Sequence, residues 1–359
     1  MKPFIANFIN MGRIAFSLPL FTSGLLLVIV ILYTVVRLAQ LGAFTRVESN
    51  SMVEHRVVAK VEGPEALQID HEHEILYFIS NNPCQATPTK GSIYQLDLKD
   101  GNASAKRLAI SMSDFQPHGL NLFHDNTGKY LFTNNHRLDG SHTVEIFRLT
   151  TSDTLQHFRT ISSELLSSPN DLVAVGPAKF YVTNDGRAHD RTTRAIDAFL
   201  GRKTGNVLFF DGQKFKVAVD NLSFPNGIAL DVQENVLAIG ETLSGRIIFY
   251  HLDDNYDLNI VDNMQIGRGI DNIFYSNASG QFWLARHLSL FQLAKHRKNV
   301  DNSSAYEVIA INFRTKGLKR IFRSDGRFNS GVSAAVIHNN RLFLGAVCDN
   351  VLLELMVSN

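Results

Sequence analysis

From about residue 55 onward, hydrophobic and polar positions follow one pattern that returns along the chain. In 169–184 (PNDLVAVGPAKFYVTN), a proline and a polar residue begin an apolar segment, which a polar turn joins to a second apolar segment. Short segments rich in β-branched and aromatic residues are typical of β-strands. Further copies begin at 64, 117 and 225, related pairs stand near 272 and 333, and no long stretch has helical periodicity. The pattern predicts an all-β fold.

The spacing of these copies indicates how the strands are arranged. The matching positions are Glu65, His118, Asn170, Asn226, Asn272 and Ser333. Successive copies lie between 46 (272 − 226) and 61 (333 − 272) residues apart, and most hold a third apolar segment. Repeats of this length in an all-strand chain predict a six-bladed β-propeller, with a β-sandwich of coincidental spacing as the alternative. The preceding segment 55–61 is predicted to complete the last blade and close the ring.

The N-terminal region has a different character from the repeats. Residues 14–36 contain no charged side chain. A helix of this length reaches about 35 Å, enough to cross a bilayer core of roughly 30 Å. A cleaved signal peptide is the alternative, although its apolar part is only about 7–15 residues long. We expect two parts: residues 1–50, a transmembrane anchor with its linker, and residues 51–359, the propeller.

Composition limits the function classes. A chain of 359 residues that is 45% hydrophobic can bury a sizeable core, and a formal net charge of +1 does not favour a nucleic-acid partner. The two cysteines, Cys84 and Cys348, can pair, but two isolated cysteines decide neither their pairing nor the redox compartment.

The repeated polar positions predict a binding site. In a propeller the innermost strands line a central channel, so the residues that begin these strands converge on the axis at one end. The predicted ring consists of Glu65, His118, Asn170, Asn226, Asp271 with Asn272, and Ser333. Because most of these side chains offer oxygen, the ring suits Ca²⁺ better than zinc or copper. A hydrogen-bonded polar plug around water is the alternative.

These residues and their surroundings resemble the paraoxonase (arylesterase/lactonase) family and, more distantly, gluconolactonases and strictosidine-synthase-like propellers. The resemblance covers essentially the whole chain and rests on segments in family order, among them FQPHGLNLF, SSPNDLVAVGPAKFYVTND, NLSFPNGIAL and GIDNIFY. It implies a catalytic calcium whose ligands are the set that the repeats place on the axis. These ligands are Glu65, Asn170, Asn226, Asp271 and Asn272.

The resemblance also implies a histidine dyad formed by His118 and His136. One imidazole takes a proton from water and the other supports it, which a neutral imidazole with a pKa near 6.5 can do close to pH 7. The calcium polarises the ester carbonyl. His287 falls where the family has a further pocket histidine. For each histidine the alternative is a hydrogen-bonded residue of the wall.

Three departures from the family pattern change these expectations. In the family, the second, structural calcium is held by an aspartate directly after the first-repeat glutamate, by the residue that matches Asp171 and by the carbonyl that matches Leu120. Here Ala66 follows Glu65, so one carboxylate is missing and we expect this site to be weak, differently built or empty. The disulfide that joins first and last strands in animal members is not expected, since the matching terminal residue is Leu353. Residues 186–205 are basic with a helical turn, unlike the family's aromatic active-site loop, which leaves the substrate range open.

The sequence therefore predicts a membrane-anchored, calcium-dependent hydrolase of small-molecule lactones, with aryl esters as further substrates. A calcium site of modest affinity fills more readily outside the cytosol, which favours a periplasmic, luminal or extracellular propeller. One alternative is a sugar-lactonase of the gluconolactonase kind, which needs no histidine pair. The other is a non-catalytic propeller that binds a partner and keeps the ion for structure.

Overall fold

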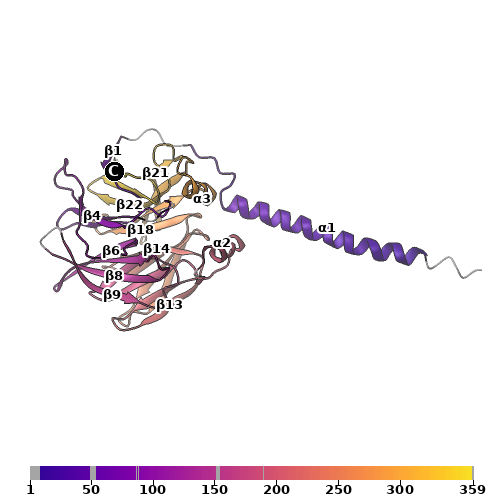
Figure 1. Cartoon of the computed structure of the whole chain (residues 1–359), viewed down its shortest axis with the longest axis horizontal. Coiled ribbons are helices and arrows are strands. Elements are labelled where there is room, and N and C mark those ends of the chain that lie inside the picture. Colours follow the sequence, from indigo (N-terminus) through magenta and orange to yellow (C-terminus); the bar gives the residue numbers. More distant parts are fainter. Residues whose placement is uncertain are drawn as a thin grey trace, which may run out of the picture.

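The computed structural model describes residues 9–48, 54–85, 87, 89–150, 154–188 and 190–357, without the side chains of 9–21 and 191. Its strands form six four-stranded antiparallel sheets, arranged as the blades of a propeller (Figure 1). The predicted all-β, six-bladed fold is confirmed. The predicted boundary between residues 50 and 51 lies outside the described residues.

Within each of blades 1 to 5, the strands follow chain order from the axis outward. Blade 1 comprises β2 Leu67–Asp70, β3 Ile75–Ser80, β4 Ser92–Asp97 and β5 Lys106–Arg107. Blade 2 comprises β6 Pro117–Asp125, β7 Gly128–His136, β8 His142–Leu149 and β9 Leu155–Ser162. Blade 3 comprises β10 Pro169–Gly176, β11 Lys179–Asn184, β12 Gly205–Phe210 and β13 Phe215–Leu222. Blade 4 comprises β14 Pro225–Asp231, β15 Val236–Glu241, β16 Arg246–Leu252 and β17 Leu258–Gln265. Blade 5 comprises β18 Ile270–Ser276, β19 Gln281–His287, β20 Tyr306–Asn312 and β21 Gly317–Ser324. Blade 6 comprises β22 Val332–His338, β23 Arg341–Ala346, β24 Leu352–Met356 and β1 His55–Ala59.

The middle strands of the blades are buried on both faces, which explains their near-continuous apolar sequences. Every residue of β12 (GNVLFF) and of β15 (VLAIGE) is buried, because each blade packs between two others. Large aromatic side chains fill the spaces, and Phe132, Phe249 and Phe343 are completely inaccessible to solvent. Burying a side chain of this size stabilises a fold by about 1.5–3 kcal/mol. Packing between blades therefore holds the six sheets together.

β1 closes the ring, as the sequence predicts. It pairs antiparallel with β24, the last strand of the chain, with Val57 opposite Leu353 and His55 opposite Leu355. Arg56 Nη2 also lies 2.5 Å from Glu354 Oε2, which belongs to the same pair of strands. The outermost strand of blade 6 thus comes from the beginning of the propeller and the three inner strands come from its end.

A disulfide between Cys84 and Cys348 makes a second link between the ends of the ring. The Cα atoms are 5.7 Å apart and the sequence separation is 264 residues. Cys84 lies in the connection between β3 and β4 of blade 1, and Cys348 lies between β23 and β24 of blade 6. Leu353 pairs with β1 instead, so the link between first and last strands is made by hydrogen bonds and not by sulfur.

One end of the propeller carries its longest connections, and we call this end the mouth face. The innermost strands begin there, and the second strand of each blade turns into the third there. Two of these turns contain a helix, α2 Arg191–Leu200 in blade 3 and α3 Leu290–Lys298 in blade 5. α2 confirms the predicted helical turn in 186–205. α3 has little hydrophobic periodicity in its sequence (LFQLAKHRK) and was not predicted.

α1 Ile9–Gln40 extends from the propeller beside α2 and α3 (Figure 1). Its segment Thr22–Gln40 has a mean hydropathy of 2.1 and is not buried against the propeller. By length and composition it can cross a membrane or act as a signal segment. The side chains of residues 22–33 are exposed in the isolated chain, as expected for either kind of segment.

Removing the disulfide should lower the stability of the propeller without abolishing the ring. With both Cys84 and Cys348 changed to serine, we expect a loss of about 2–5 kcal/mol in unfolding free energy, since the unfolded chain regains the freedom of a long loop. Urea denaturation followed by circular dichroism measures the change, and wild-type protein in reductant provides the matched comparison. Equal midpoints for oxidised and reduced wild type would contradict the prediction.

The anchor should resist extraction from membranes. Since Thr22–Gln40 is long and apolar enough to span, the full chain should remain in the membrane pellet after washes with high salt and with alkaline carbonate. A chain that begins near Ser51 should stay in the supernatant. The measurement is the partition of each chain on ultracentrifugation, and release of the full chain by salt alone would show that it does not span.

Candidate functional site

The predicted ring residues come together at the mouth-face end of the channel. Glu65 lies just before β2, and Asn170, Asn226 and Asp271 are each the second residue of an innermost strand. These four side chains are buried, with between 6% and 9% of each residue exposed. The polar positions of the repeat are therefore a buried axial cluster, which is unusual for carboxylates and requires partners.

A break in strand register accompanies the axial position in five of the six blades. Pairing between the first two strands shifts between His118 and Asn121, Pro169 and Leu172, Pro225 and Ile228, Ile270 and Ile273, and Val332 and Ala334. Extra residues at such a bulge change the direction in which a side chain points. In blades 2, 3 and 4 a proline begins the innermost strand, and the next side chain lies at the bulge. In blades 5 and 6 an aliphatic residue takes the place of the proline.

Two blades have glycine after the axial residue because neighbouring backbone lies close there. A Cβ at Gly119, which has φ +66°, would lie 2.7 Å from Asn170 O, and one at Gly227 would lie 2.4 Å from Asp271 O. Such distances are too short for any side chain. At the equivalent place in blade 3, Asp171 accepts a hydrogen bond from the Ile228 amide at 3.1 Å.

Residues at the ends of the second strands hold the backbone of the next blade in place. Asn134 Nδ2 donates to Asn170 O at 2.9 Å, Thr183 Oγ1 to Asn226 O at 2.8 Å, and Thr242 Oγ1 to Ile270 O at 2.6 Å. These roles of Asn134, Thr183 and Thr242 were not predicted from the sequence. Their signal is the polar pair that ends the second strand in three blades, at 133–134, 183–184 and 241–242.

Glu65 is the most connected member of the axial cluster. Its carbonyl accepts hydrogen bonds from Asn272 Nδ2 at 2.9 Å and from Ser333 Oγ at 3.1 Å. Its carboxylate Oε2 lies 3.1 Å from His118 Nδ1. Residues of blades 2, 5 and 6 therefore all contact Glu65, just before β2, and these contacts fix its carboxylate at the axis.

The environment separates the protonation states of the predicted histidine dyad. Burial lowers the pKa of His118, but the charge and hydrogen bond of Glu65 outweigh burial and raise it to about 9. The ring of His136 lies against that of His118, with centroids 5.0 Å apart and planes at 89°. Burial, followed by the charges of His118 and His142, holds the pKa of His136 well below its ordinary value. The pair combines a proton-holding imidazole with a neutral one, as acid–base sites require.

His287 supports a carboxylate and does not line an open pocket. Only 2% of the residue is exposed, and its Nε2 lies 2.6 Å from Asp271 Oδ2. Each axial carboxylate therefore has one histidine: His118 beside Glu65 and His287 behind Asp271.

The residues present fit a calcium ion on the axis. Glu65, Asn170, Asn226, Asp271 and Asn272 offer carboxylate and amide oxygens, the donors that Ca²⁺ prefers. Asn226 Oδ1 is buried, and no hydrogen-bond partner for it lies within the described part of the chain. An acceptor left without a donor in this position is satisfied by a cation, which also offsets two buried negative charges.

A second calcium is not supported by the neighbouring cavity. The cavity has a volume of about 10 Å³, and Ala66, Leu120, Asp171 and Asn272 contribute to its lining. Both oxygens of Asp171 already accept backbone hydrogen bonds, from Leu172 and Ile228. Burial raises the pKa of Asp171 to about 7. This donor set does not fit Ca²⁺, which takes about six to eight oxygens, and the space is about that of one water.

Asp70, Glu72 and His73 form another group whose ligand atoms are close together, at the opposite end of blade 1. Lys129 Nζ lies within hydrogen-bond distance of Asp70 and His73. Because an ammonium group already occupies the centre of this group, we interpret it as a structural ion pair between blades 1 and 2.

Comparison with known proteins agrees with this geometry. A family model described as Arylesterase matches residues 54–355. Serum paraoxonase/arylesterase 1 of Rattus norvegicus is 30% identical over 270 residues, which is 72% of this chain and 76% of the relative. Serum paraoxonase/arylesterase 2 of Homo sapiens is 29% identical over 266 residues, covering 72% and 74%.

Among solved structures, the calcium-binding protein regucalcin from Agrobacterium tumefaciens superposes with a TM-score of 0.52. The alignment covers 85% of this chain and 94% of that one at 15% sequence identity. At this identity the likeness concerns the propeller fold.

Asp271→Asn should weaken calcium binding while the fold persists. The change removes one negative charge from the ring at nearly constant size, so we expect affinity to fall about tenfold or more, equivalent to about 1.4 kcal/mol. Isothermal titration calorimetry with Ca²⁺ measures it. Asp231→Asn is the matched control, since Asp231 is also buried but bonds Tyr275 at the far end of β14. Equal affinities in the wild type and the Asp271 variant would remove Asp271 from the ligand set.

Proposed function

The chain belongs to the arylesterase family, and from this premise we propose that it is a calcium-dependent hydrolase of lactones and aryl esters. Family membership supports a hydrolase, and the observation that carries the finer assignment is the histidine pair beside Glu65. A structural ion needs axial oxygens, but it does not need a neutral imidazole packed against a second histidine. A non-catalytic propeller accounts for the first feature and not for the second.

The proposed division of labour follows from the contacts of each residue. Glu65, Asn170, Asn226, Asp271 and Asn272 would hold Ca²⁺, which would supply positive charge to polarise the substrate carbonyl and stabilise the oxyanion. His118 uses Nδ1 to contact Glu65. Without a cation this contact keeps His118 protonated. A cation held by Glu65 would offset the negative charge that raises the pKa of His118, so the imidazole would become neutral and its Nε2 could take a proton from the attacking water.

His136 supports this proton transfer from the other side of His118. Its Nε2 is buried and has no hydrogen-bond partner within the described residues. A neutral imidazole with a free lone pair beside His118 can hold a proton transiently and pass it on. His287 keeps the Asp271 carboxylate in a single orientation, a supporting role in place of proton transfer.

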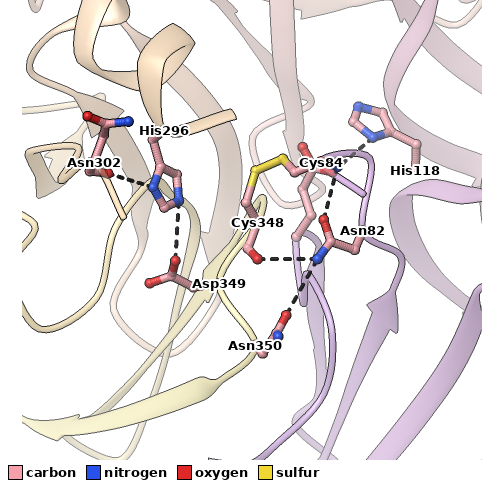
Figure 2. Close-up of a disulfide and its surroundings, with 9 residues drawn as sticks. Asn82, Cys84, His118, His296, Asn302, Cys348, Asp349 and Asn350 are labelled. Carbon is pink, nitrogen blue, oxygen red and sulfur yellow. Dashed lines mark hydrogen bonds and ion pairs between the residues drawn. A yellow bond between two sulfur atoms is a disulfide. The ribbon is translucent and has the colours of Figure 1, made fainter. Parts of the chain in front are cut away.

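Two observations support an extracytoplasmic propeller. The Cys84–Cys348 disulfide requires an oxidising compartment in most organisms. Cys84 and Cys348 lie in connections of the mouth face, and Figure 2 shows them together with His118 and the His296–Asp349 pair. A calcium site of modest affinity also fills more readily outside the cytosol.

His118→Gln should abolish most turnover and leave calcium binding intact. Glutamine retains a donor for Glu65 but cannot take a proton, so we expect kcat for lactone hydrolysis to fall by about 10²-fold or more. His136→Gln should lower it less. The measurement is turnover of the full chain in detergent on simple lactones, sugar lactones and aryl esters, with and without a calcium chelator.

His157→Gln is the matched control, because His157 bonds the buried Glu145 in blade 2, away from the axis. Turnover on sugar lactones alone, unchanged in the His118 variant, would favour the gluconolactonase-like alternative. Wild-type activity that persists in excess chelator would exclude the calcium mechanism.

A further inference from the structure

The last turns of α1 make direct contacts with the propeller. Arg37 Nε donates to Phe199 O at 2.6 Å, and its Nη2 donates to Ala198 O at 2.9 Å. Tyr33 donates from its hydroxyl to Leu200 O at 3.2 Å, and its ring lies edge-on to that of Phe199 at 6.3 Å. These carbonyls all belong to the final turn of α2.

α2 depends on such an external partner. The last carbonyls of a helix have no N–H donor within the helix, and they carry its partial negative charge. α2 has only ten residues and no basic side chain in its last turn. The αL residue Gly201 donates to Ala198 O and so satisfies part of this end. Arg37 adds positive charge at this last turn, which has no basic residue of its own. Arg202, two residues past the helix, pairs with Asp197.

The segment after α1 holds α3 in the same way. The Phe291 amide donates to Leu41 O at 3.0 Å, and Ser289 Oγ donates to Gly42 O at 2.7 Å. Gln292 Nε2 donates to Thr45 O at 3.3 Å. The end of the anchor therefore contacts both helices of the mouth face, one from blade 3 and one from blade 5.

α2 in turn presents Arg194 to the site. Its guanidinium contacts Ser168 Oγ and lies 3.6 Å from Asp185 Oδ1. Ser168 stands two residues before the axial Asn170, and Asp185 is partly buried with a pKa that desolvation raises above its ordinary value. The charge of Arg194 also opposes protonation of His136. A displacement of α2 thus changes the wall beside the histidine pair.

We infer that Arg37 is a positioning residue for the active site. By holding the carboxyl end of α2, it fixes Arg194 against Ser168 and Asp185. Attachment of α1 is therefore needed for full substrate affinity. The inference rests on the proposed hydrolase function. It assigns Tyr33 and Arg37, at the carboxyl end of the candidate span Thr22–Gln40, a role in completing the mouth face in addition to membrane attachment. It also requires that α1 remain part of the mature chain.

Arg37→Gln in the full chain, in detergent, tests the inference. We expect KM for a lactone to rise about tenfold, kcat to change less than about twofold and calcium affinity to remain unchanged, since one charge-assisted cap is lost and the axis is untouched. Hydrogen exchange of the α2 amides should become about tenfold faster. Arg37→Lys should restore part of the affinity, because lysine keeps the charge but not the two-carbonyl geometry.

Two further variants separate positioning from general destabilisation. Arg46→Gln removes an equal charge nine residues further on and should change neither KM nor exchange. Arg194→Gln should raise KM as Arg37→Gln does while α2 exchange stays slow. If Arg37→Gln fails to fold, Tyr33→Phe, which removes one bond to α2 and keeps the ring contact, should show the same changes at smaller size.

The outcomes that overturn the inference are distinct from failure of the proposed function. Unchanged α2 exchange in Arg37→Gln, or faster exchange with unchanged KM, rejects the positioning role. A mature N-terminus located after Arg37 by mass spectrometry also rejects it. A wild-type chain without hydrolysis of any tested ester rejects the proposed function and the kinetic role of Arg37, while the exchange data still measure the clamp on α2.

Discussion

Antiparallel pairing between β1 and β24 joins the two ends of the propeller, and the axial site exists only because these ends meet. Six residues after β1 the chain reaches Glu65, whose carbonyl is bound by Asn272 of blade 5 and Ser333 of blade 6. If the ring were open, blade 1 would be separated from blades 5 and 6, and these hydrogen bonds to the Glu65 carbonyl would be lost. The Cys84–Cys348 disulfide crosses the same junction at the mouth face. Closure therefore stabilises the fold and assembles the site in one step.

The closed ring then creates an electrostatic problem on its axis. Glu65 and Asp271 bring two carboxylates into a buried channel, where an unpaired charge is costly. Each is paired with an imidazole, by His118 and by His287 respectively. The oxygens that remain form a donor set for a hard cation. The groups that make buried charge tolerable are also those that the proposed ester hydrolysis would use, so stability and proposed chemistry draw on the same residues.

The six blades share one plan, and the departures from that plan gather on the mouth face. α2 and α3 are insertions in blades 3 and 5, and the end of α1 contacts both. Loops tolerate such insertions because strand pairing and blade packing are unaffected by them, and function commonly resides there. The clamp of Arg37 on α2 connects α1 to the helix that carries Arg194. α2 occupies much of 186–205, so this insertion changes the mouth face while the axial residues stay in place.

Much of this architecture was predictable because it depends on patterns within short stretches of the sequence. The six repeats, the all-β class, the closing segment at residue 55 and the apolar helix each depend on periodicity or length within a short window. The axial positions followed as well, since a repeated polar residue at the start of each inner strand must converge once the ring closes.

Other features were decided only by tertiary structure. The Cys84–Cys348 bond, the register breaks that turn Asn170 and Asn226 to the axis, the contact between His118 and His136, and the docking of Arg37 on α2 appear in no local pattern. Even α3 (LFQLAKHRK) gains its helical form from a cap at Ser289 and from contacts with the segment after α1. These interactions join residues that are distant along the chain. Their geometry depends on how blades pack against one another, because packing sets inter-blade distances that no short stretch of sequence contains.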